Sequence, residues 1–199
     1  RYVGSYRRML KLAETKLFLC TCELCTSITE LESYQGCLRC SACRDAGKEG
    51  WLVPVEPISR SCTGGGQKAH RKTLASQLEA EIHSSRWKSS RSGCLAKELT
   101  GAYVMGRDEE LRGLLSEAEA LADRGDTDAA RSALLALVAK CRADCHPNHY
   151  IAYQARTWLA TKLMDTVPAS NSRDLLLKFE LTLSAIAAGL CILHTGYDP

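Results

Sequence analysis

The sequence predicts a mainly α-helical protein in which a small cysteine-rich segment, held together by zinc, precedes an antiparallel array of helices. Seven of the 11 cysteines lie between residues 20 and 66. From residue 107 onward apolar residues recur with helical spacing, and 45% of the 199 residues are hydrophobic, which is enough to bury a core. We therefore divide the chain into four parts, which are residues 1–19, 20–66, 67–106 and 107–199.

The first two parts differ in what can order them. Residues 1–19 are expected to form a short helix that runs into an extended segment, with apolar positions at Leu10, Leu12 and Leu17. Residues 20–66 contain Gly and Pro throughout and few large apolar side chains. This composition favours turns and short strands and builds little core, so we expect metal to supply the order.

The third part is expected to contain a weak helix and a connecting segment. Leu74, Leu78 and Ile82 recur at i, i+4 and i+8, which is the spacing of one helix face. The stretch SSRWKSSRSG, residues 84–93, is basic and rich in serine. It is predicted to be a mobile linker to the helical part.

The fourth part is predicted to hold four amphipathic helices that resemble the antiparallel helix pairs of a TPR-like repeat array. Gly125 ends the first helix, and Asp126 or Thr127 can cap the second, so these two form a hairpin. Pro147 suits the first position of the third helix, and Ser172 can cap the fourth. The apolar faces include Leu111, Leu114, Leu115, Ala118 and Leu121, then Ala130, Leu134, Leu137 and Cys141, then Ile151, Ala155, Trp158 and Leu159, and finally Leu175, Phe179, Leu183 and Leu190.

The stretch LFLCTCELCTS places Cys20, Cys22 and Cys25 within six residues. Structural zinc prefers thiolates, which it binds at about 2.3 Å in a tetrahedron. The alternative is a group of buried free thiols, and the close spacing favours metal. An odd number of cysteines, 11, with C-x-C and C-x-x-C spacing also argues against a disulfide framework. We therefore expect a reducing, intracellular compartment, cytoplasmic or nuclear.

A second group of cysteines follows at C-x-x-C-x-x-C spacing and consists of Cys37, Cys40 and Cys43. Cys62 is a candidate partner from the far side of the Gly- and Pro-containing segment. These residues predict a second zinc site.

The charge pattern is weakly basic and uneven. The formal net charge is +3, and residues 1–100 carry 16 Lys and Arg against 10 Asp and Glu. No apolar run is long enough to cross a bilayer, so we expect no membrane contact. The basic patches could contact a nucleosome or nucleic acid, but a solvated surface is the favoured interpretation. The patches contain Arg7, Arg8, Lys11, Arg86, Lys88 and Arg91.

The stretch CRADCHPNHY, residues 141–150, looks like a zinc knuckle. We favour another interpretation, in which Cys141 continues an apolar helix face and His146 and His149 do not bind metal. His70 and His83 lie in polar stretches and are expected to contact solvent.

Three motifs in order resemble the SMYD (SET and MYND domain) family of protein-lysine methyltransferases, in particular its arthropod branch. GSYRRMLKLAETKLFLCTCELCTSITELESY, residues 4–34, resembles the end of the SET domain and the post-SET segment, with its F-x-C-x-C-x-x-C pattern. CSACRDAGKEGWLVPVEPI, residues 40–58, is similar to the C-x-x-C and G-x-L-x-P-x-x-P-L extension of that branch. CHPNHYIAYQA, residues 145–155, is similar to the L-H-P-N-H-Y landmark of the helical C-terminal domain. This likeness implies a turn between helices in which His146 and His149 cap and pack.

The resemblance implies that residues 20–66 are a zinc-binding post-SET segment. In the family the fourth thiolate comes from the SET core, beside an Asn-His segment that binds S-adenosylmethionine. We expect that segment and the catalytic tyrosine upstream of residue 1. The phenylalanine two residues before the first cysteine, here Phe18, lies against the adenine of the methyl donor. For residues 1–199 without the SET core, we favour its alternative role as a core residue beneath the zinc turn.

The chain also departs from the family pattern. The branch extension ends in W-x-C-x-x-C, whereas here Cys62 is kept while Arg60 replaces the Trp and Gly65 replaces the last Cys. Under the resemblance either Cys37 fills the vacant position or the second zinc binds weakly.

Two functions follow from these observations. The first is the C-terminal portion of a SMYD-like protein-lysine methyltransferase that uses S-adenosylmethionine in the intact protein and is inactive as residues 1–199 alone. The second is a catalytically inactive helical module with a structural zinc, which binds a peptide or a partner protein.

Overall fold

The computed structural model describes residues 3–58 and 71–160, and over these ranges the protein is mainly helical with a small three-stranded sheet. This confirms the mainly α fold class, while the TPR-like arrangement stays a prediction. The chain divides into two compact units, Arg1–Asp108 and Glu109–Pro199, and the boundary falls inside helix α5 (Gly101–Asp123). Within the described ranges, none of the helices combines the length and the apolar character that crossing a bilayer requires.

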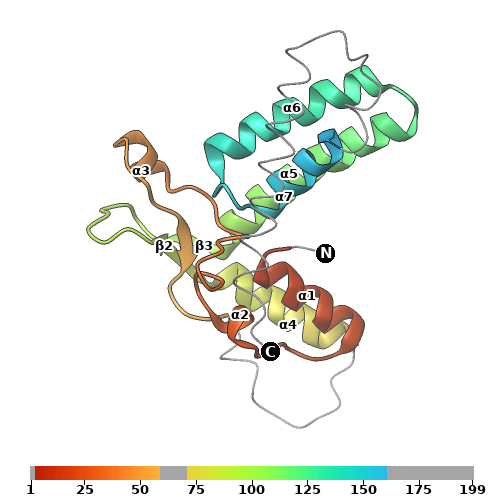
Figure 1. Ribbon diagram of the computed structural model, residues 1–199. Helices are drawn as coiled ribbons and strands as arrows, with labels where there is room; N and C mark the ends of the chain where they lie inside the picture. Colours follow the sequence, from red (N-terminus) through yellow and green to blue (C-terminus); the bar gives the residue numbers. More distant parts are fainter. Residues whose placement is uncertain (1–2, 59–70, 161–199) are drawn as a thin grey trace. The chain divides into compact units, whose positions relative to one another are not determined.

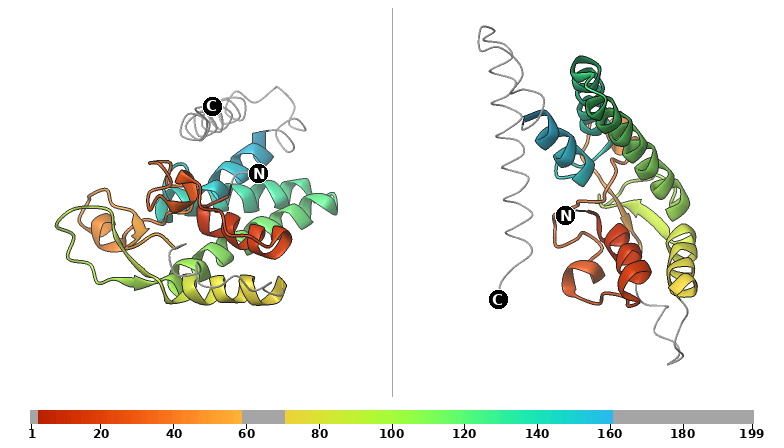
Figure 2. Two further views of the ribbon diagram at one scale, coloured as in Figure 1. Left: turned by 90° about the horizontal axis from the view of Figure 1, so that it is seen from below. Right: turned by 90° about the vertical axis from the view of Figure 1, so that its right-hand side faces the viewer.

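The first unit is built on two helices, α1 (Ser5–Lys16) and α4 (Arg71–Ser84), which lie side by side (Figures 1 and 2). α1 buries Met9, and α4 buries Leu78 and Ile82, so both predicted helices are found. α1 ends at Lys16, and the next residue, Leu17, caps it in a left-handed conformation with φ of 61°. Leu17 is therefore 42% exposed and is not the buried position that the apolar pattern predicted.

The sheet consists of three short antiparallel strands in the order β1 (Leu52–Pro54), β2 (Arg86–Ser89) and β3 (Leu99–Thr100). The predicted mobile linker is thus wrong, because its centre is strand β2. Trp87 is 3% exposed, and its ring meets the edge of the Tyr6 ring at a centroid distance of 6.3 Å. Its two neighbours in the strand, Arg86 and Lys88, are exposed and charged. In the sequence these outward-facing charges made a half-buried strand look like a basic linker.

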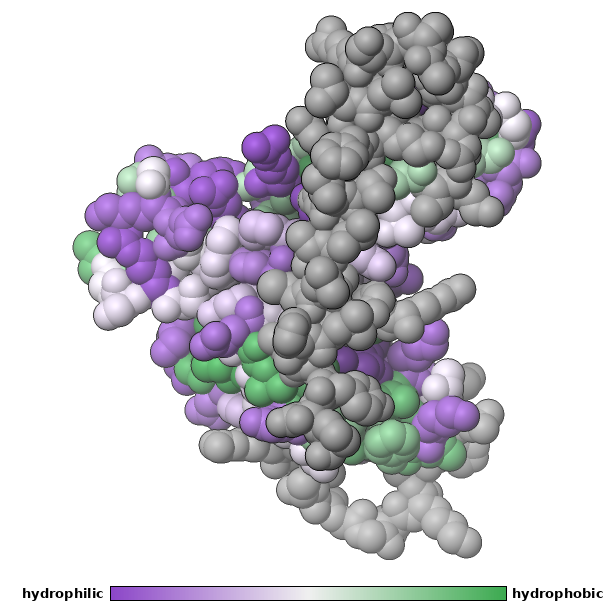
Figure 3. Space-filling model, in the orientation of Figure 1, coloured by the Kyte–Doolittle hydropathy of each residue, from purple (hydrophilic) through white to green (hydrophobic). Residues whose placement is uncertain are grey.

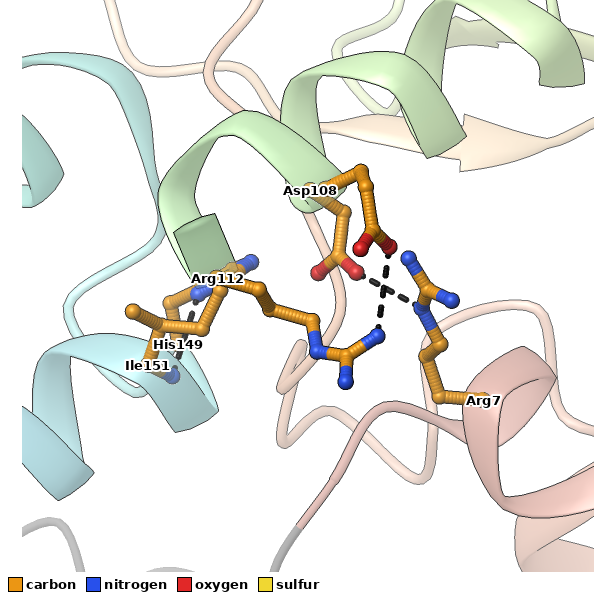
Figure 4. Close-up of polar contacts among 6 residues, drawn as sticks. Arg7, Asp108, Arg112, His149 and Ile151 are labelled. Atoms are coloured by element: carbon orange, nitrogen blue, oxygen red, sulfur yellow. Dashed lines mark hydrogen bonds and ion pairs between the residues drawn. The ribbon is translucent and has the colours of Figure 1, made fainter. Parts of the chain in front are cut away.

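Helix α5 begins at Gly101 rather than near residue 107. Its buried face includes Val104, Asp108 and Leu111, at i, i+4 and i+7. The aspartate interrupts the apolar pattern, which hid the first turns of the helix. Its side chain is 1% exposed and lies 2.8 Å from Nε of Arg7, and this ion pair makes a carboxylate tolerable there (Figure 4).

The second unit contains the rest of α5, then α6 (Thr127–Asp144) and α7 (Tyr150–Trp158). The predicted turn between α5 and α6 is confirmed: Gly125 has φ of +81°, and the Asp126 carboxylate accepts a hydrogen bond of 3.2 Å from the Ala129 amide. The two helices run side by side as an antiparallel hairpin (Figure 2), and Lys140 on α6 pairs with Glu110 on α5 at 3.2 Å.

The third predicted helix starts later than expected. Pro147 is exposed in the turn before α7, and His149 is the N-cap, with Nδ1 accepting a hydrogen bond of 3.4 Å from the Ile151 amide. This residue supplies the capping acceptor, so the helix begins at Tyr150. Trp158 is half-buried at the end of α7. The fourth predicted helix, which Ser172 was expected to cap, lies outside the described residues.

Candidate metal centres

The first cysteine cluster forms at the short helix α2 (Glu23–Thr26). Cys20, Cys22 and Cys25 bring their sulfur atoms within 4.8 Å of one another. Cys22 is the N-cap residue of α2, and its carbonyl accepts 3.0 Å hydrogen bonds from the Cys25 and Thr26 amides. This tight turn brings thiols that are neighbours in sequence onto one point, and tetrahedral zinc requires that convergence.

Arg8 on α1 supplies a positive charge to this cluster. Its Nη2 lies 3.2 Å from Sγ of Cys25. Burial raises the pKa of the Cys25 thiol to about 12, although the hydrogen bond and charge of Arg8 act to lower it. Partial burial acts to raise the pKa of Cys22 as well, but hydrogen bonds from the Cys25 amide and from the neighbouring thiols, with the Arg8 charge, bring it below its ordinary value. A bound metal ion would deprotonate such thiols.

A buried carboxylate holds the loop after α2 against α1. Glu30 is 6% exposed, and its two oxygens accept hydrogen bonds from the Ser5 amide and, at 2.8 Å, from the Gly36 amide. Ser5 also donates its hydroxyl to the Leu24 carbonyl at 3.2 Å. The N-terminal turn of α1 is thereby tied to the first cluster at Leu24 and to the loop that follows it at Glu30.

The second cluster combines residues that are far apart in the sequence. Cys40 is the N-cap of helix α3 (Ser41–Asp45), Cys43 lies in α3, and Cys94 lies in the connection between β2 and β3. The Cys94 sulfur is 3.8 Å from that of Cys40 and 3.4 Å from that of Cys43. All three sulfurs fall within 4.8 Å of one another, so this group could also hold a metal ion.

Hydrogen bonds shift the pKa values of two thiols in the second cluster. A hydrogen bond from the Ala96 amide lowers the pKa of Cys94 to about 7, and a hydrogen bond with Cys43 acts in the same direction. A hydrogen bond with Ser89 lowers the pKa of Cys43, but burial and the neighbouring thiols outweigh it and raise that pKa above its ordinary value. Cys94 therefore loses its proton before Cys43 does.

The surface around the second cluster is mainly hydrophilic over α3 and over the β2–β3 connection (Figure 3). Apart from Cys43, the residues from Ser41 to Glu49 are exposed. Backbone hydrogen bonds from Cys40 to the Gly50 carbonyl at 2.9 Å, and from Lys48 to the Cys43 carbonyl at 2.8 Å, close the turn. This segment has little apolar surface to bury, so a bound metal ion would supply much of its order.

The two clusters draw together five of the seven predicted metal ligands. Cys37 is not among them: it is 2% exposed and outside both clusters, and burial, followed by the charge of Glu30, raises its pKa well above the ordinary value. Cys62 lies outside the described residues. Sequence reasoning missed Cys94, and the available signal was a cysteine placed directly after Gly93 at the end of a stretch with strand-like alternation.

Phe18, the predicted cofactor-binding residue, is 48% exposed just before the first cluster. Its alternative role as a core residue beneath the zinc turn is therefore wrong for the described structure. Phe18 lies after the end of α1, in a stretch that is neither helix nor strand.

The histidine turn behaves as predicted. His149 is fully buried and caps α7, while Nδ1 of His146 accepts a 3.1 Å hydrogen bond from the Asn148 amide. Cys141 is 1% exposed on the apolar face of α6. Over residues 3–58 and 71–160, three or more potential ligands converge only at the two cysteine clusters, so this turn is not a third centre. His83 is exposed, as expected, and His70 is outside the described residues.

Comparison with known proteins adds no family assignment: the chain matches no protein-family model, no curated protein and no solved structure. The fold and the sites define a mainly helical protein with two groups of three cysteines that could hold metal ions.

Proposed function

We propose that this chain is the C-terminal portion of a SMYD-like protein-lysine N-methyltransferase, in which Cys20, Cys22 and Cys25 hold a structural zinc beside the S-adenosylmethionine site of the intact protein. The observation that carries the proposal is the convergence of these three sulfurs directly after the half-exposed ring of Phe18. The order of aromatic ring and cysteines follows the F-x-C-x-C-x-x-C pattern of the post-SET segment.

The exposure of Phe18 supports a binding role for this ring. A half-exposed phenylalanine forgoes part of its hydrophobic stabilisation, on the order of 1 kcal/mol when about half of the side chain stays in water. Leu17 beside it is 42% exposed, so two successive apolar side chains are exposed just before the cluster. An adenine ring stacked on Phe18 would recover that burial, since aromatic faces pair favourably.

The first cluster supports a closing role for the post-SET segment. Three thiolates satisfy three corners of a tetrahedral zinc, and the resemblance assigns the fourth corner to a cysteine of the SET core. A zinc ion shared in this way would fasten the Phe18 segment to the core that binds the methyl donor. In the intact protein the methyl group would pass from the sulfonium of the donor to a lysine amine, with a tyrosine-lined channel orienting the amine.

The chain alone is expected to be inactive. A cavity lined by Tyr6, Cys25, Glu30 and Trp87, among others, has a volume of about 20 Å³. That space suits about one water molecule, whereas pockets for molecules of cofactor size measure roughly 300–1,000 Å³. We expect the donor pocket to come from the SET core, so residues 1–199 alone should neither bind S-adenosylmethionine nor transfer methyl groups.

The test begins with the coding sequence upstream of Arg1. An Asn-His-x-Cys segment and an aligned tyrosine there support the enzyme. The longer protein is then assayed for transfer of labelled methyl from S-adenosylmethionine to protein lysines. Phe18→Ala should raise the KM for the donor roughly tenfold, the equivalent of 1.4 kcal/mol of lost stacking. Tyr103→Ala is the matched control, because Tyr103 is an aromatic residue that is also 48% exposed.

Two results would overturn the proposal. If the upstream sequence lacks those residues, the chain belongs to a helical interaction module with structural metal. If the longer protein methylates lysine but Phe18→Ala behaves like Tyr103→Ala, the post-SET segment does not contact the donor.

A further inference from the structure

The second cluster has an oxygen atom beside its three sulfurs. The Ser89 hydroxyl lies 3.4 Å from Sγ of Cys43, and it also forms a hydrogen bond with the Cys94 thiol. The Arg91 amide donates to the same oxygen at 3.3 Å, which orients the hydroxyl group. Ser89 thus contacts two of the three cysteines.

These distances agree with a tetrahedral centre. Sulfurs bound to zinc at about 2.3 Å with tetrahedral angles lie about 3.8 Å apart, and an oxygen ligand at about 2.0–2.2 Å lies about 3.5–3.7 Å from each sulfur. The separation of Cys40 and Cys94 is 3.8 Å, that of Cys43 and Cys94 is 3.4 Å, and that of Cys43 and Ser89 is 3.4 Å. Three of the six separations among these four atoms are therefore close to those of a tetrahedral site, and the three sulfurs all lie within 4.8 Å of one another.

Strand pairing in the sheet places Ser89 beside the second cluster. It is the last residue of β2, and its backbone pairs with Leu52 on β1. A methyl group added at Gly50 would lie 2.6 Å from Sγ of Cys43 and 2.8 Å from Oγ of Ser89. A glycine is needed at this position because the backbone passes close to the Cys43 sulfur on α3 and to the Ser89 hydroxyl on β2. The two side chains thus meet at Gly50.

We propose that Cys40, Cys43 and Cys94 form a second metal centre for a zinc-class ion, with the Ser89 hydroxyl at the fourth corner. The sequence had suggested Cys62 or Cys37 as the fourth ligand, and neither is required in this arrangement. A hydroxyl is a weaker and harder ligand than a thiolate, so the centre binds zinc less tightly than a four-cysteine site. The proposal does not depend on methyltransferase activity.

The experiment uses the full reduced chain with Cys22→Ser, which weakens the first cluster at an exposed residue. Zinc affinity is measured by competition with a chromophoric chelator, and cobalt spectra report the number of thiolates. Cys94→Ser should lower the affinity roughly 10- to 100-fold or more, since even changes to residues that support ligands have effects of that size. Ser89→Cys should raise the affinity at least about tenfold and increase the thiolate-to-cobalt band by about one third, as three thiolates become four.

The alternatives give different results. Cys62→Ser should leave the affinity within about twofold, and Ser89→Ala should lower it severalfold. X-ray absorption of the zinc-loaded Cys22→Ser protein should show three sulfurs and one light atom, a readout that needs no variant at position 89. Four sulfurs, or a loss of affinity on Cys62→Ser equal to that of Cys94→Ser, would overturn the role of Ser89. If Cys94→Ser binds zinc as tightly as its parent, the second cluster is not a metal centre. The first cluster would be unaffected by that result.

Discussion

Replacing Gly50 with alanine tests how tightly the second cluster is built. The new Cβ would lie 2.6 Å from Sγ and 3.0 Å from Cβ of Cys43, and 2.8 Å from Oγ of Ser89. Normal contacts between such atoms are about 3.5–4.0 Å, so the groups must separate by roughly 1 Å. Cys43 cannot simply rotate away, because its Cβ is crowded as well as its sulfur.

The expected cost has two components. Overpacking of this kind destabilises a fold by about 1–3 kcal/mol. A sulfur displaced by roughly 1 Å also leaves the metal–ligand distance outside the tolerance of about 0.2 Å that a site accepts. We therefore expect zinc affinity at the second cluster to fall at least tenfold, or about 1.4 kcal/mol.

The assay combines zinc affinity with hydrogen exchange at the amides of Cys40 and Lys48, which close the turn. Gly47→Ala is the control: Gly47 lies in the same turn with φ of +65°, and a methyl group there meets nothing within 4 Å. That control should lose about 1 kcal/mol of stability through backbone strain while keeping its zinc affinity. Wild-type zinc affinity in Gly50→Ala would refute the reasoning, because the close approach would then not hold the ligands in place.

Two further predictions concern charge. Burial, followed by the charge of His149, lowers the pKa of His146 to about 4 from an ordinary 6.5. Between these pH values the unfolded chain therefore binds more protons than the folded chain, so the free energy of unfolding should fall by about 1–2 kcal/mol as the pH drops through that window, after allowance for partial exposure. Urea unfolding at pH 7 and pH 4.5 measures this change. An equal loss of stability between the two pH values in His146→Gln would contradict the assignment. Arg7→Ala should lower stability by about 3 kcal/mol, because it removes a cation from an almost fully buried carboxylate. Asp108→Asn should lower stability less, because the arginine is 19% exposed and can reach water. Thermal unfolding of both variants shows which loss is larger, and a larger loss in Asp108→Asn would show that the pair is not the main support of that carboxylate.

What the sequence by itself determined is local. Helical periodicity identified α1, α4 and α6, because the contacts that define a helix join residues three or four apart. The convergence of Cys20, Cys22 and Cys25 was predictable for the same reason, since one tight turn is enough to bring them together. Gly125 and Asp126 likewise marked a turn through backbone geometry and a side-chain cap of their own.

The tertiary structure decided what depends on distant partners. Cys94 joins Cys43 across 51 positions, and Ser89 joins it across 46, because β1 and β2 pair and bring the two segments together. The buried Asp108 carboxylate on α5 pairs with Arg7, which lies 101 positions away in the sequence. No local pattern carries these pairings, since strand register and ion-pair partners are set when the segments pack against one another and exclude water.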